Sequence, residues 1–433
     1  MRAYAIYGWL ALATLVPWQP PARADNWPQW RGPGGDGLCA ETEVPVTWAE
    51  GSGIEWKCRL PEWGNSTPAI WGETVFVTSH VDDQRLVLLR IDKGSGRIVW
   101  SREVGRGSAP QATSPSRGRL MFHREHNLAS PSPVTDGKTV VAHFGNGDLV
   151  AYDFDGRRLW HRNLCRDYGR YTSLWGHANS PVLVGDLVVS VCIQDPCDNL
   201  LDPPGSSYVV AHDKRTGREV WKTTRTTGAT RFAADSYVTP ILRKADNRTE
   251  LVVAGGEWLD AYDPATGKRL WCLPGLTGKE LARSPVAAHG MIYTAQGLGR
   301  ALLAIRPGGD GQRAQDDVAW TFGNVAWDVP SPVVCGGWLF LVDNMGIARC
   351  LDALTGEVLW EQRLRGRHRA SPIAAGGRIY FLNTEGLTTV VSASANFEKL
   401  AENQLDDRTY ASPAVSDGKI FIRGREWLYC IGR

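Results

Sequence analysis

The chain has 433 residues, and its 48 Lys and Arg residues nearly balance its 46 Asp and Glu residues. Such an even balance of charge offers no general attraction to nucleic acid or to an acidic membrane. The length would ordinarily indicate two or three domains, but a closed array of repeats reaches this size as one unit.

Residues 1–24 have the pattern of a secretory signal peptide. Arg2 gives a positive start, Ala3–Val16 is the apolar stretch, and Ala22-Arg23-Ala24 is an Ala-x-Ala cleavage site. The apolar stretch is short for a membrane span, and the alternative is an uncleaved anchor. Cleavage removes two basic residues and no acidic residue, so the mature chain has 46 of each. We expect a soluble exported protein, periplasmic or extracellular, with no membrane anchor in the mature chain.

Residues 25–50 are rich in Gly, Pro and Trp and lack periodicity. We interpret them as an N-terminal extension packed on a larger domain, residues 51–433. Trp27 and Trp30 are expected to anchor the extension, because an exposed Trp in such a segment usually docks on its own protein. Stacking of these indoles on a ligand is the alternative.

Residues Ser331–Leu364 show the repeat from which the domain is built. Four short apolar runs alternate with turns rich in Gly, Asn and Asp, which is the pattern of strands joined by hairpins. A strand-opening Pro that always follows Ser or Thr recurs eight times, at Pro68, Pro133, Pro181, Pro240, Pro285, Pro332, Pro372 and Pro413. Four strands in a period of about 40–50 residues are typical of a propeller blade. The sequence therefore predicts an all-β, eight-bladed β-propeller of four-stranded antiparallel blades.

The two ends of this domain are predicted to share one blade. The last unit, Ser412–Arg433, contains three strands, whereas the first Trp-bearing strand, Ile54–Leu60, has no partners of its own. The N-terminal strand 54–60 should complete the C-terminal blade, which closes the ring and removes an exposed sheet edge. In the register that we expect, Trp56 lies near Leu428.

A turn-and-Trp motif, Asp-x-x-Thr-Gly-x-x-x-Trp, recurs along the chain. Its Asp, Gly and Trp positions are Asp213, Gly217 and Trp221, then Asp263, Gly267 and Trp271, then Asp352, Gly356 and Trp360. The motif resembles the boxes of the pyrroloquinoline quinone (PQQ) quinoprotein-like repeat family, and the resemblance covers nearly all of residues 51–433. It implies that each Trp docks between neighbouring blades. That family includes PQQ dehydrogenases and outer-membrane assembly lipoproteins of the BamB type.

Nine cysteines are an odd number, so they cannot all pair internally. Cys192 and Cys197 flank a short loop, and export makes them the best candidates for a disulfide. Cys58 and Cys430 lie on the two closing strands, but the register expected above keeps them apart. No Cys-x-x-Cys pair or His-rich cluster indicates a metal site, and no Cys-x-x-Cys-His motif indicates a haem.

Loop length predicts which face of the propeller is functional. The longest irregular segments, Gly105–Ala129, Arg166–Asn179 and Gln194–Ser207, fall on the face that carries the links into the first strands. The residues just before each strand-opening Pro should ring the central channel there. Candidate ligand-binding residues in this ring are Trp63, Asn65, His126, Asn127, Trp175, His177, Asn179, Tyr237, Arg283, Trp327, Asp328, His368, Arg369, Arg408 and Tyr410.

Three kinds of side chain in this ring could bind a ligand. The Trp residues could stack on a planar ring or a sugar face, the Arg residues could meet an anion, and the His residues could act as bases. The structural alternative is a channel wall of polar groups that hydrate one another, with each Arg paired to a carboxylate. No catalytic residue is assigned, because no third partner orients any of the histidines.

The function that we expect is a non-catalytic binding or scaffold module. It would act as an exported monomer and meet a protein, small-molecule or glycan partner at the loop-rich rim and the central polar mouth, with no nucleic-acid partner. The resemblance implies two alternatives: a divergent PQQ-dependent dehydrogenase with PQQ and Ca²⁺, and a BamB-like assembly factor. Glu62 and Glu280 stand only at the edges of the ring, which makes a calcium cage hard to assemble. No lipidation Cys follows the signal pattern, which counts against the assembly factor.

Overall fold

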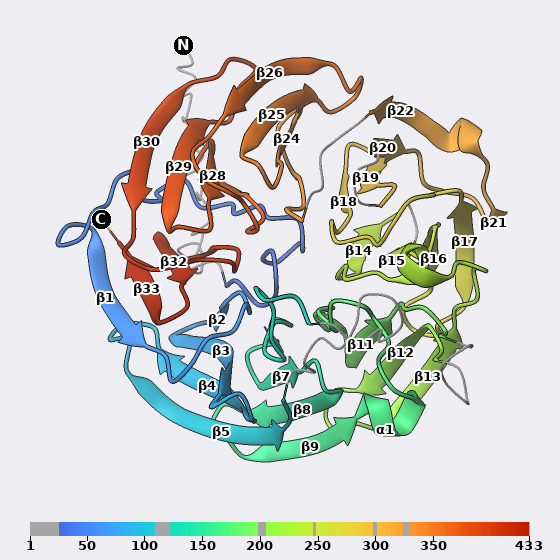
Figure 1. Ribbon diagram of the computed structural model, residues 1–433, viewed down its shortest axis with the longest axis horizontal. Coiled ribbons are helices and arrows are strands. Elements are labelled where there is room, and N and C mark those ends of the chain that lie inside the picture. Colours follow the sequence, from blue (N-terminus) through green and yellow to red (C-terminus); the bar gives the residue numbers. More distant parts are fainter. Residues whose placement is uncertain are drawn as a thin grey trace, which may run out of the picture.

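The computed structural model describes residues 26–108, 122–197, 205–245, 248–297, 301–323 and 329–432, so the predicted signal segment 1–24 lies outside the described residues. Within these ranges the strands form eight sheets around a central axis (Figure 1). The predicted all-β, eight-bladed propeller is therefore confirmed. Helix in this part of the chain is limited to α1 (Leu164–Tyr168) and two short 3-10 turns, η1 (Arg231–Ala234) and η2 (Gln315–Asp317). None of the described helices is long and apolar enough to cross a membrane.

In each blade the first strand lies nearest the axis and the fourth lies at the outer rim (Figure 1). The strands of blades one to four are β2 (Ala69–Trp71), β3 (Thr74–Val81), β4 (Arg85–Asp92) and β5 (Ile98–Arg106); β6 (Val134–Thr135), β7 (Thr139–His143), β8 (Asp148–Asp153) and β9 (Arg158–Asn163); β10 (Val182–Val184), β11 (Leu187–Cys192), β12 (Tyr208–Asp213) and β13 (Glu219–Thr224); β14 (Ile241–Lys244), β15 (Thr249–Gly255), β16 (Trp258–Tyr262) and β17 (Arg269–Pro274).

The remaining strands form blades five to eight in the same way. They are β18 (Val286–Ala288), β19 (Met291–Ala295), β20 (Leu302–Ile305) and β22 (Val318–Phe322); β23 (Val333–Cys335), β24 (Trp338–Val342), β25 (Ile347–Asp352) and β26 (Val358–Arg363); β27 (Ile373–Ala375), β28 (Arg378–Leu382), β29 (Leu387–Ser392) and β30 (Lys399–Gln404); β31 (Ala414–Ser416), β32 (Lys419–Arg423), β33 (Trp427–Ile431) and β1 (Ile54–Arg59).

The eighth blade combines two distant parts of the chain. β1 pairs antiparallel with β33 and is the outer strand of that sheet, the position predicted for strand 54–60. The register differs from the expected one, because Trp56 lies opposite Cys430 rather than Leu428. A bulge between Ile54 and Trp56 accompanies this shift. Cys58 faces Leu428, so Cys58 and Cys430 are offset along the ladder and no disulfide joins them.

The Asp-x-x-Thr-Gly turn of one blade holds the Trp of the preceding blade. The Trp160 indole N–H donates to the Lys214 carbonyl at 2.8 Å. Asp213 fixes the turn by accepting a hydrogen bond from the Thr216 N–H at 2.9 Å. Gly217 has φ +69°, and a Cβ there would lie 2.6 Å from the Trp160 ring, so glycine is required on both counts. Equivalent contacts join Trp221 to Gly267 and Trp320 to Gly356.

Blade five lacks the Asp-x-x-Thr-Gly turn that would contact Trp271 of blade four, and a different element lies beside this Trp. An insertion after β20 forms β21 (Gly311–Gln312), which pairs parallel with β17 alongside Trp271. Trp271 is buried, yet its indole N–H has no hydrogen-bond partner among the described residues. Blade four thus has the predicted four antiparallel strands, and the insertion adds a fifth, parallel strand to its outer edge.

A circle of hydrogen bonds joins the blades around the axis. At seven of the eight strand-opening Pro residues, the backbone N–H of the preceding Ser or Thr donates to the hydroxyl of its counterpart in the next blade, as Ser284 N does to Ser331 Oγ at 2.9 Å. The series closes where the Thr67 hydroxyl donates to the Ser412 carbonyl at 3.1 Å. The buried members are Thr67, Ser132, Ser180, Thr239, Ser284, Ser331, Ser371 and Ser412. We call this set the hydroxyl circle.

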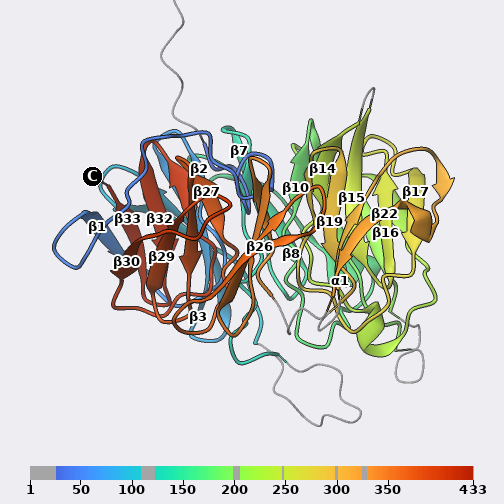
Figure 2. The same ribbon diagram turned by 90° about the horizontal axis from the view of Figure 1, so that it is seen from above.

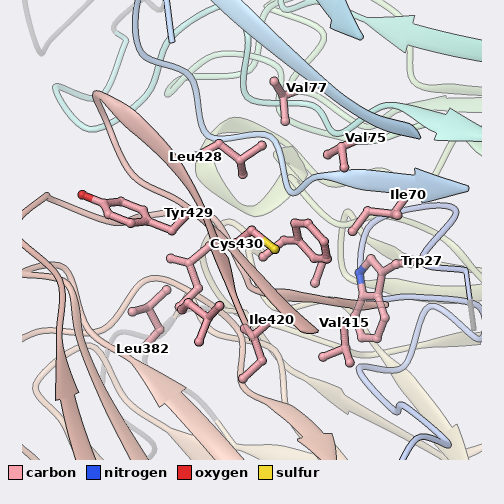
Figure 3. Packing of buried hydrophobic residues seen from close by; sticks show 14 of the residues in the cluster. Trp27, Ile70, Val75, Val77, Leu382, Val415, Ile420, Leu428, Tyr429 and Cys430 are labelled. Carbon is pink, nitrogen blue, oxygen red and sulfur yellow. The ribbon is translucent and has the colours of Figure 1, made fainter. Parts of the chain in front are cut away.

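The N-terminal extension crosses one end of the central channel. It contacts hairpins between first and second strands, because Gly72 N donates to Asn26 Oδ1 at 2.8 Å and Asp417 N donates to Glu41 Oε1 at 2.8 Å. Each first strand is entered from a link at one end and is followed by one of these hairpins at its other end. The extension therefore lies at the end of the channel away from the links. Figure 2 shows the extension, in dark blue, along the upper edge of the ring. Trp27 is 1% exposed and packs near Ile70 in a hydrophobic cluster (Figure 3).

Gly217→Ala tests the contact between blades. The added Cβ would meet the Trp160 ring, so we expect it to lower the free energy of unfolding by about 1–3 kcal/mol more than Gly290→Ala does. Gly290 is the matched control, because it has φ +73° but open space around its Cβ position. Denaturant unfolding of both variants measures the difference. Equal losses would mean that the Trp160 contact adds nothing to the backbone strain that the two sites share.

Ser331→Ala tests the hydroxyl circle. The change leaves the buried Ser284 N–H without its acceptor, so we expect a loss of about 1–3 kcal/mol in the free energy of unfolding. Ser331→Thr keeps the hydroxyl and should cost much less, since Thr67 and Thr239 occupy the same place in other blades. Thermal melts compare the two variants. A threonine variant as unstable as the alanine variant would contradict the role of the hydroxyl.

Candidate functional site

The central channel contains a cavity of about 470 Å³. Part of its wall is the hydroxyl circle, and the rest comes mainly from residues just before the strand-opening Pro residues. Trp30 of the extension also lines this cavity. Since the extension crosses the channel end opposite these links, Trp30 lies at that end of the cavity, which we call its floor, and we call the end near the links its mouth.

The structure brings six of the predicted residues to the cavity wall: Asn65, His126, Trp175, Tyr237, Arg369 and Tyr410. They come from links into blades one, two, three, four, seven and eight, so the predicted convergence around the axis holds for these six. Trp327 and Asp328, from the link into blade six, lie outside the described residues.

Five predicted residues are buried behind the wall instead, each at most 2% exposed: Asn127, His177, Asn179, Arg283 and His368. Asn127, Asn179 and Arg283 donate to backbone carbonyls, whereas both ring nitrogens of His177 and Nδ1 of His368 have no hydrogen-bond partner among the described residues. Asn179 Nδ2 donates to the Val238 carbonyl at 2.6 Å, and Arg283 Nε donates to the Pro330 carbonyl at 3.1 Å. In both pairs the contact joins the links of adjacent blades, so these side chains position the wall rather than face the cavity.

Trp63 and Arg408 line a separate charged groove beside the eighth blade. The Arg425 guanidinium lies 4.8 Å from the centre of the Trp63 ring, a cation–π contact. Neither predicted residue reaches the axial cavity.

An ion pair spans the mouth of the cavity. Arg369 Nε, on the link into blade seven, donates to Glu125 Oε2 at 2.9 Å, on the link into blade two. Asn65 Nδ2 donates to the Glu125 backbone carbonyl at 2.6 Å. Arg369 therefore has a carboxylate partner within the protein, as the structural alternative for these arginines expects.

Trp175, Tyr237 and Glu280 form one side of the wall. The Trp175 indole N–H donates to Glu280 Oε1 at 3.1 Å, and the Trp175 backbone N–H donates to the Tyr237 hydroxyl at 3.2 Å. Glu280 is 4% exposed, and its Oε2 has no hydrogen-bond partner among the described residues. A buried carboxyl oxygen without a donor is costly, which marks this atom as available to a ligand.

The predicted histidines are weak bases in this structure. Burial lowers the pKa of His126 to about 3 and that of His368 to about 4. Burial also holds the pKa of His177 well below its ordinary value, with His143 adding to the effect. A general base works best with a pKa near the operating pH. Near pH 7 these rings are neutral hydrogen-bonding groups, and the His126 Nε2 has no partner among the described residues.

Several residues of the wall were not chosen as candidates from the sequence. They include Trp30, His123, Glu125, Glu280, Asn344 and Arg367. Glu280 stands five residues before Pro285, and a wider window ahead of each strand-opening Pro would have included it. Trp30 was assigned to packing, since nothing local in residues 25–50 indicates that the extension crosses the axis.

The described residues of the cavity wall do not form a metal cage. Among the described residues no three His, Cys, Asp or Glu side chains converge as a metal site. Of the two carboxylates in the wall, Glu125 is already bound to Arg369. Ca²⁺ requires six to eight oxygen ligands, so the described residues do not fit the PQQ and Ca²⁺ pair that the family resemblance implies.

The predicted disulfide between Cys192 and Cys197 is wrong. Cys192 ends β11 and is buried in the core around Tyr208, whereas the Cys197 thiol donates to Asp195 Oδ2 at 3.3 Å. Cys197 has φ +49°, and this turn directs its side chain toward Asp195 rather than back to the strand. Spacing along the chain could not reveal that turn.

The repeated blades, the Trp–Gly contacts and the axial cavity define a β-propeller of the PQQ-like type. The sequence profile described as outer membrane protein assembly factor BamB matches residues 41–195, 205–314 and 258–422. Because these matches cover most of the chain, the protein belongs to this family of PQQ-like propeller repeats.

Two curated relatives match parts of the chain. BamB of Legionella pneumophila is 24% identical over 244 residues, 53% of this chain and 54% of that protein. The serine/threonine-protein kinase AfsK of Streptomyces griseus is 29% identical over 119 residues, 27% of this chain and 14% of the kinase. The chain thus spans only about half, or less, of the length of these relatives.

Solved structures share the fold at low sequence identity. BamB from Moraxella catarrhalis superposes with a TM-score of 0.61 at 14% identity, covering 87% of this chain and 99% of that one. A europium-containing methanol dehydrogenase superposes with a TM-score of 0.66 at 12% identity, covering 93% and 90%. Both likenesses concern the fold alone.

The buried histidines predict how stability depends on pH. In the unfolded chain His126 titrates near its ordinary value of 6.5, whereas in the folded chain its pKa is about 3. Below pH 6.5 the unfolded state therefore binds a proton that the folded state does not, and stability falls with pH toward pH 3. We expect melting temperatures to fall from pH 6.5 to pH 5, and His126→Gln to flatten this fall. His289→Gln, at an exposed position, is the control. A profile unchanged by His126→Gln would contradict the prediction.

Proposed function

We propose that this protein is an exported, non-catalytic binding propeller that holds a small, ring-shaped polar ligand in its axial cavity. One observation carries the proposal: an axial cavity with aromatic side chains on its floor and wall and with polar atoms left unpartnered. Its volume of about 470 Å³ lies within the range of about 300–1,000 Å³ common to small-molecule sites.

The lining supports a ligand with flat apolar faces and polar edges. Trp30 provides an aromatic surface on the floor, and Trp175, Tyr237 and Tyr410 provide others on the wall. Such rings pack against planar rings and sugar faces. The hydroxyls of the circle, Glu280 Oε2 and His126 Nε2 offer hydrogen bonds to the edges of the ligand. Export is supported by the signal pattern of residues 1–24 and by the family.

The two alternatives that the family suggests have less support. Oxidation with PQQ would need a metal cage, which the described residues of the cavity do not supply. A role in outer-membrane protein assembly rests on the description of the family profile. No described surface of this chain singles out a barrel-assembly partner. PQQ therefore enters the test below as one probe.

Binding can be followed by tryptophan fluorescence and calorimetry on the exported chain. The probes are cellobiose, the β-1,4-linked glucosamine disaccharide, its N-acetylated form and PQQ. We expect saturable binding of a disaccharide with one site per chain. Binding of PQQ alone would replace the proposal with a quinone site, and binding of no probe would overturn it.

Trp30→Ala tests whether the floor of the cavity contacts the ligand. Loss of the aromatic surface should weaken binding at least about tenfold, or about 1.4 kcal/mol. Trp63→Ala is the matched control, because Trp63 lies in the separate charged groove. The melting temperature of each variant confirms that it is folded. Equal affinities for the wild type and a folded Trp30→Ala variant would contradict the proposed location of the site.

A further inference from the structure

We infer that the ligand of the axial cavity carries a protonated amine, and that Glu280 binds it. This inference rests on the proposed function and names the class of ligand, a cyclic molecule with an amino group such as an amino sugar. The observations that carry it are the unpartnered oxygen of Glu280, the rigidity of its support, the balance of charge around the cavity, and the aromatic rings beside it.

Only one of the two carboxyl oxygens of Glu280 is hydrogen-bonded to the described part of the protein. Oε1 accepts a hydrogen bond from the Trp175 indole at 3.1 Å, whereas Oε2 has no hydrogen-bond partner among the described residues. The side chain is almost fully buried and lines the cavity. Burial of a charged oxygen is costly unless a donor meets it. A donor on the ligand would remove that cost.

The backbone around Glu280 is built as a fixed support. Leu281 N donates to the Asp235 carbonyl at 3.1 Å, and Tyr237 N donates to the Leu281 carbonyl at 2.8 Å. These bonds form a parallel bridge between the links into blades four and five. Trp175, from the link into blade three, then holds the Glu280 side chain. Three successive blades thus fix the carboxyl group in place before a ligand arrives.

The charges around the cavity favour a cation at Glu280. Arg369 and Glu125 neutralise each other at 2.9 Å. Burial lowers the pKa of His123 and, to about 3, that of His126, so both rings are neutral near pH 7. Arg367 is exposed to solvent, where its charge is screened. Among the described groups of the wall, Glu280 is the buried charge that has no opposite charge beside it.

The aromatic lining favours the same class of ligand. Trp175 contacts Glu280 directly, and the Tyr237 hydroxyl binds the Trp175 backbone. Aromatic faces attract ammonium groups, and the attraction grows when water is excluded. His126 Nε2 is a second buried atom of the wall that has no hydrogen-bond partner among the described residues. A carboxylate beside aromatic faces favours an ammonium group over a hydroxyl group, because both features attract positive charge.

The experiment compares three disaccharides of the same shape on the exported wild-type chain. They are the β-1,4-linked glucosamine disaccharide, its N-acetylated form and cellobiose, measured by calorimetry at pH 7. We expect the free amine to bind at least about tenfold more tightly than the other two. Equal binding of all three would overturn the amine inference and leave the proposed function standing. Binding of none would overturn both.

Glu280→Gln removes the charge and keeps the shape and an acceptor for Trp175. It should abolish the preference for the amine, so that the glucosamine disaccharide and cellobiose bind this variant with equal affinity. Glu62→Gln, in the separate groove, is the control and should keep the preference. A preference that survives in folded Glu280→Gln would overturn the assignment of Glu280. The wild-type comparison needs no variant, so it remains decisive if Glu280→Gln does not fold.

Discussion

The hydroxyl circle around the axis is the interaction on which the rest of this structure depends. A strand that opens with Pro has no N–H at its first position, so the preceding residue supplies the innermost amide, and that amide is buried. In seven of the eight pairs the acceptor is the hydroxyl of the next blade, as between Ser284 and Ser331, and in the closing pair the Thr67 hydroxyl donates to the Ser412 carbonyl. Every blade is therefore fixed by its two neighbours, and the links that carry the cavity side chains all start from fixed points.

The fold was predictable from the sequence because its signals are local. The Ser/Thr–Pro spacing gave the number of blades, and the Asp-x-x-Thr-Gly turn gave the blade contacts, since Gly217 meets Trp160 through backbone geometry that the turn itself dictates. The bulge between Ile54 and Trp56 and the extra strand β21 were not predictable. Both arise where distant segments meet, and nothing in either segment alone indicates the partner.

The candidate site was predictable only in part, for the same physical reason. The position before a strand-opening Pro places a residue near the axis, but neighbouring links decide which way its side chain points. Asn179 turns into the link of the next blade, whereas Arg369 faces Glu125, 244 residues away in the chain. Where a PQQ and Ca²⁺ site would need a cage of oxygens, the described wall offers aromatic faces and a buried carboxyl oxygen, Glu280 Oε2, that has no hydrogen-bond partner among the described residues.

The N-terminal extension also affects the stage of synthesis and folding at which the cavity can form. Residues 26–50 lie against blades one, seven and eight, and β1, which follows them, pairs with β33 near the other end of the chain. During synthesis from the N-terminus the extension is made first. Blades seven and eight, against which it packs, are made last. The floor and the closed ring therefore form together, and a product that lacks the eighth blade would have neither the β33 partner of β1 nor the Asp417 hairpin that the extension contacts.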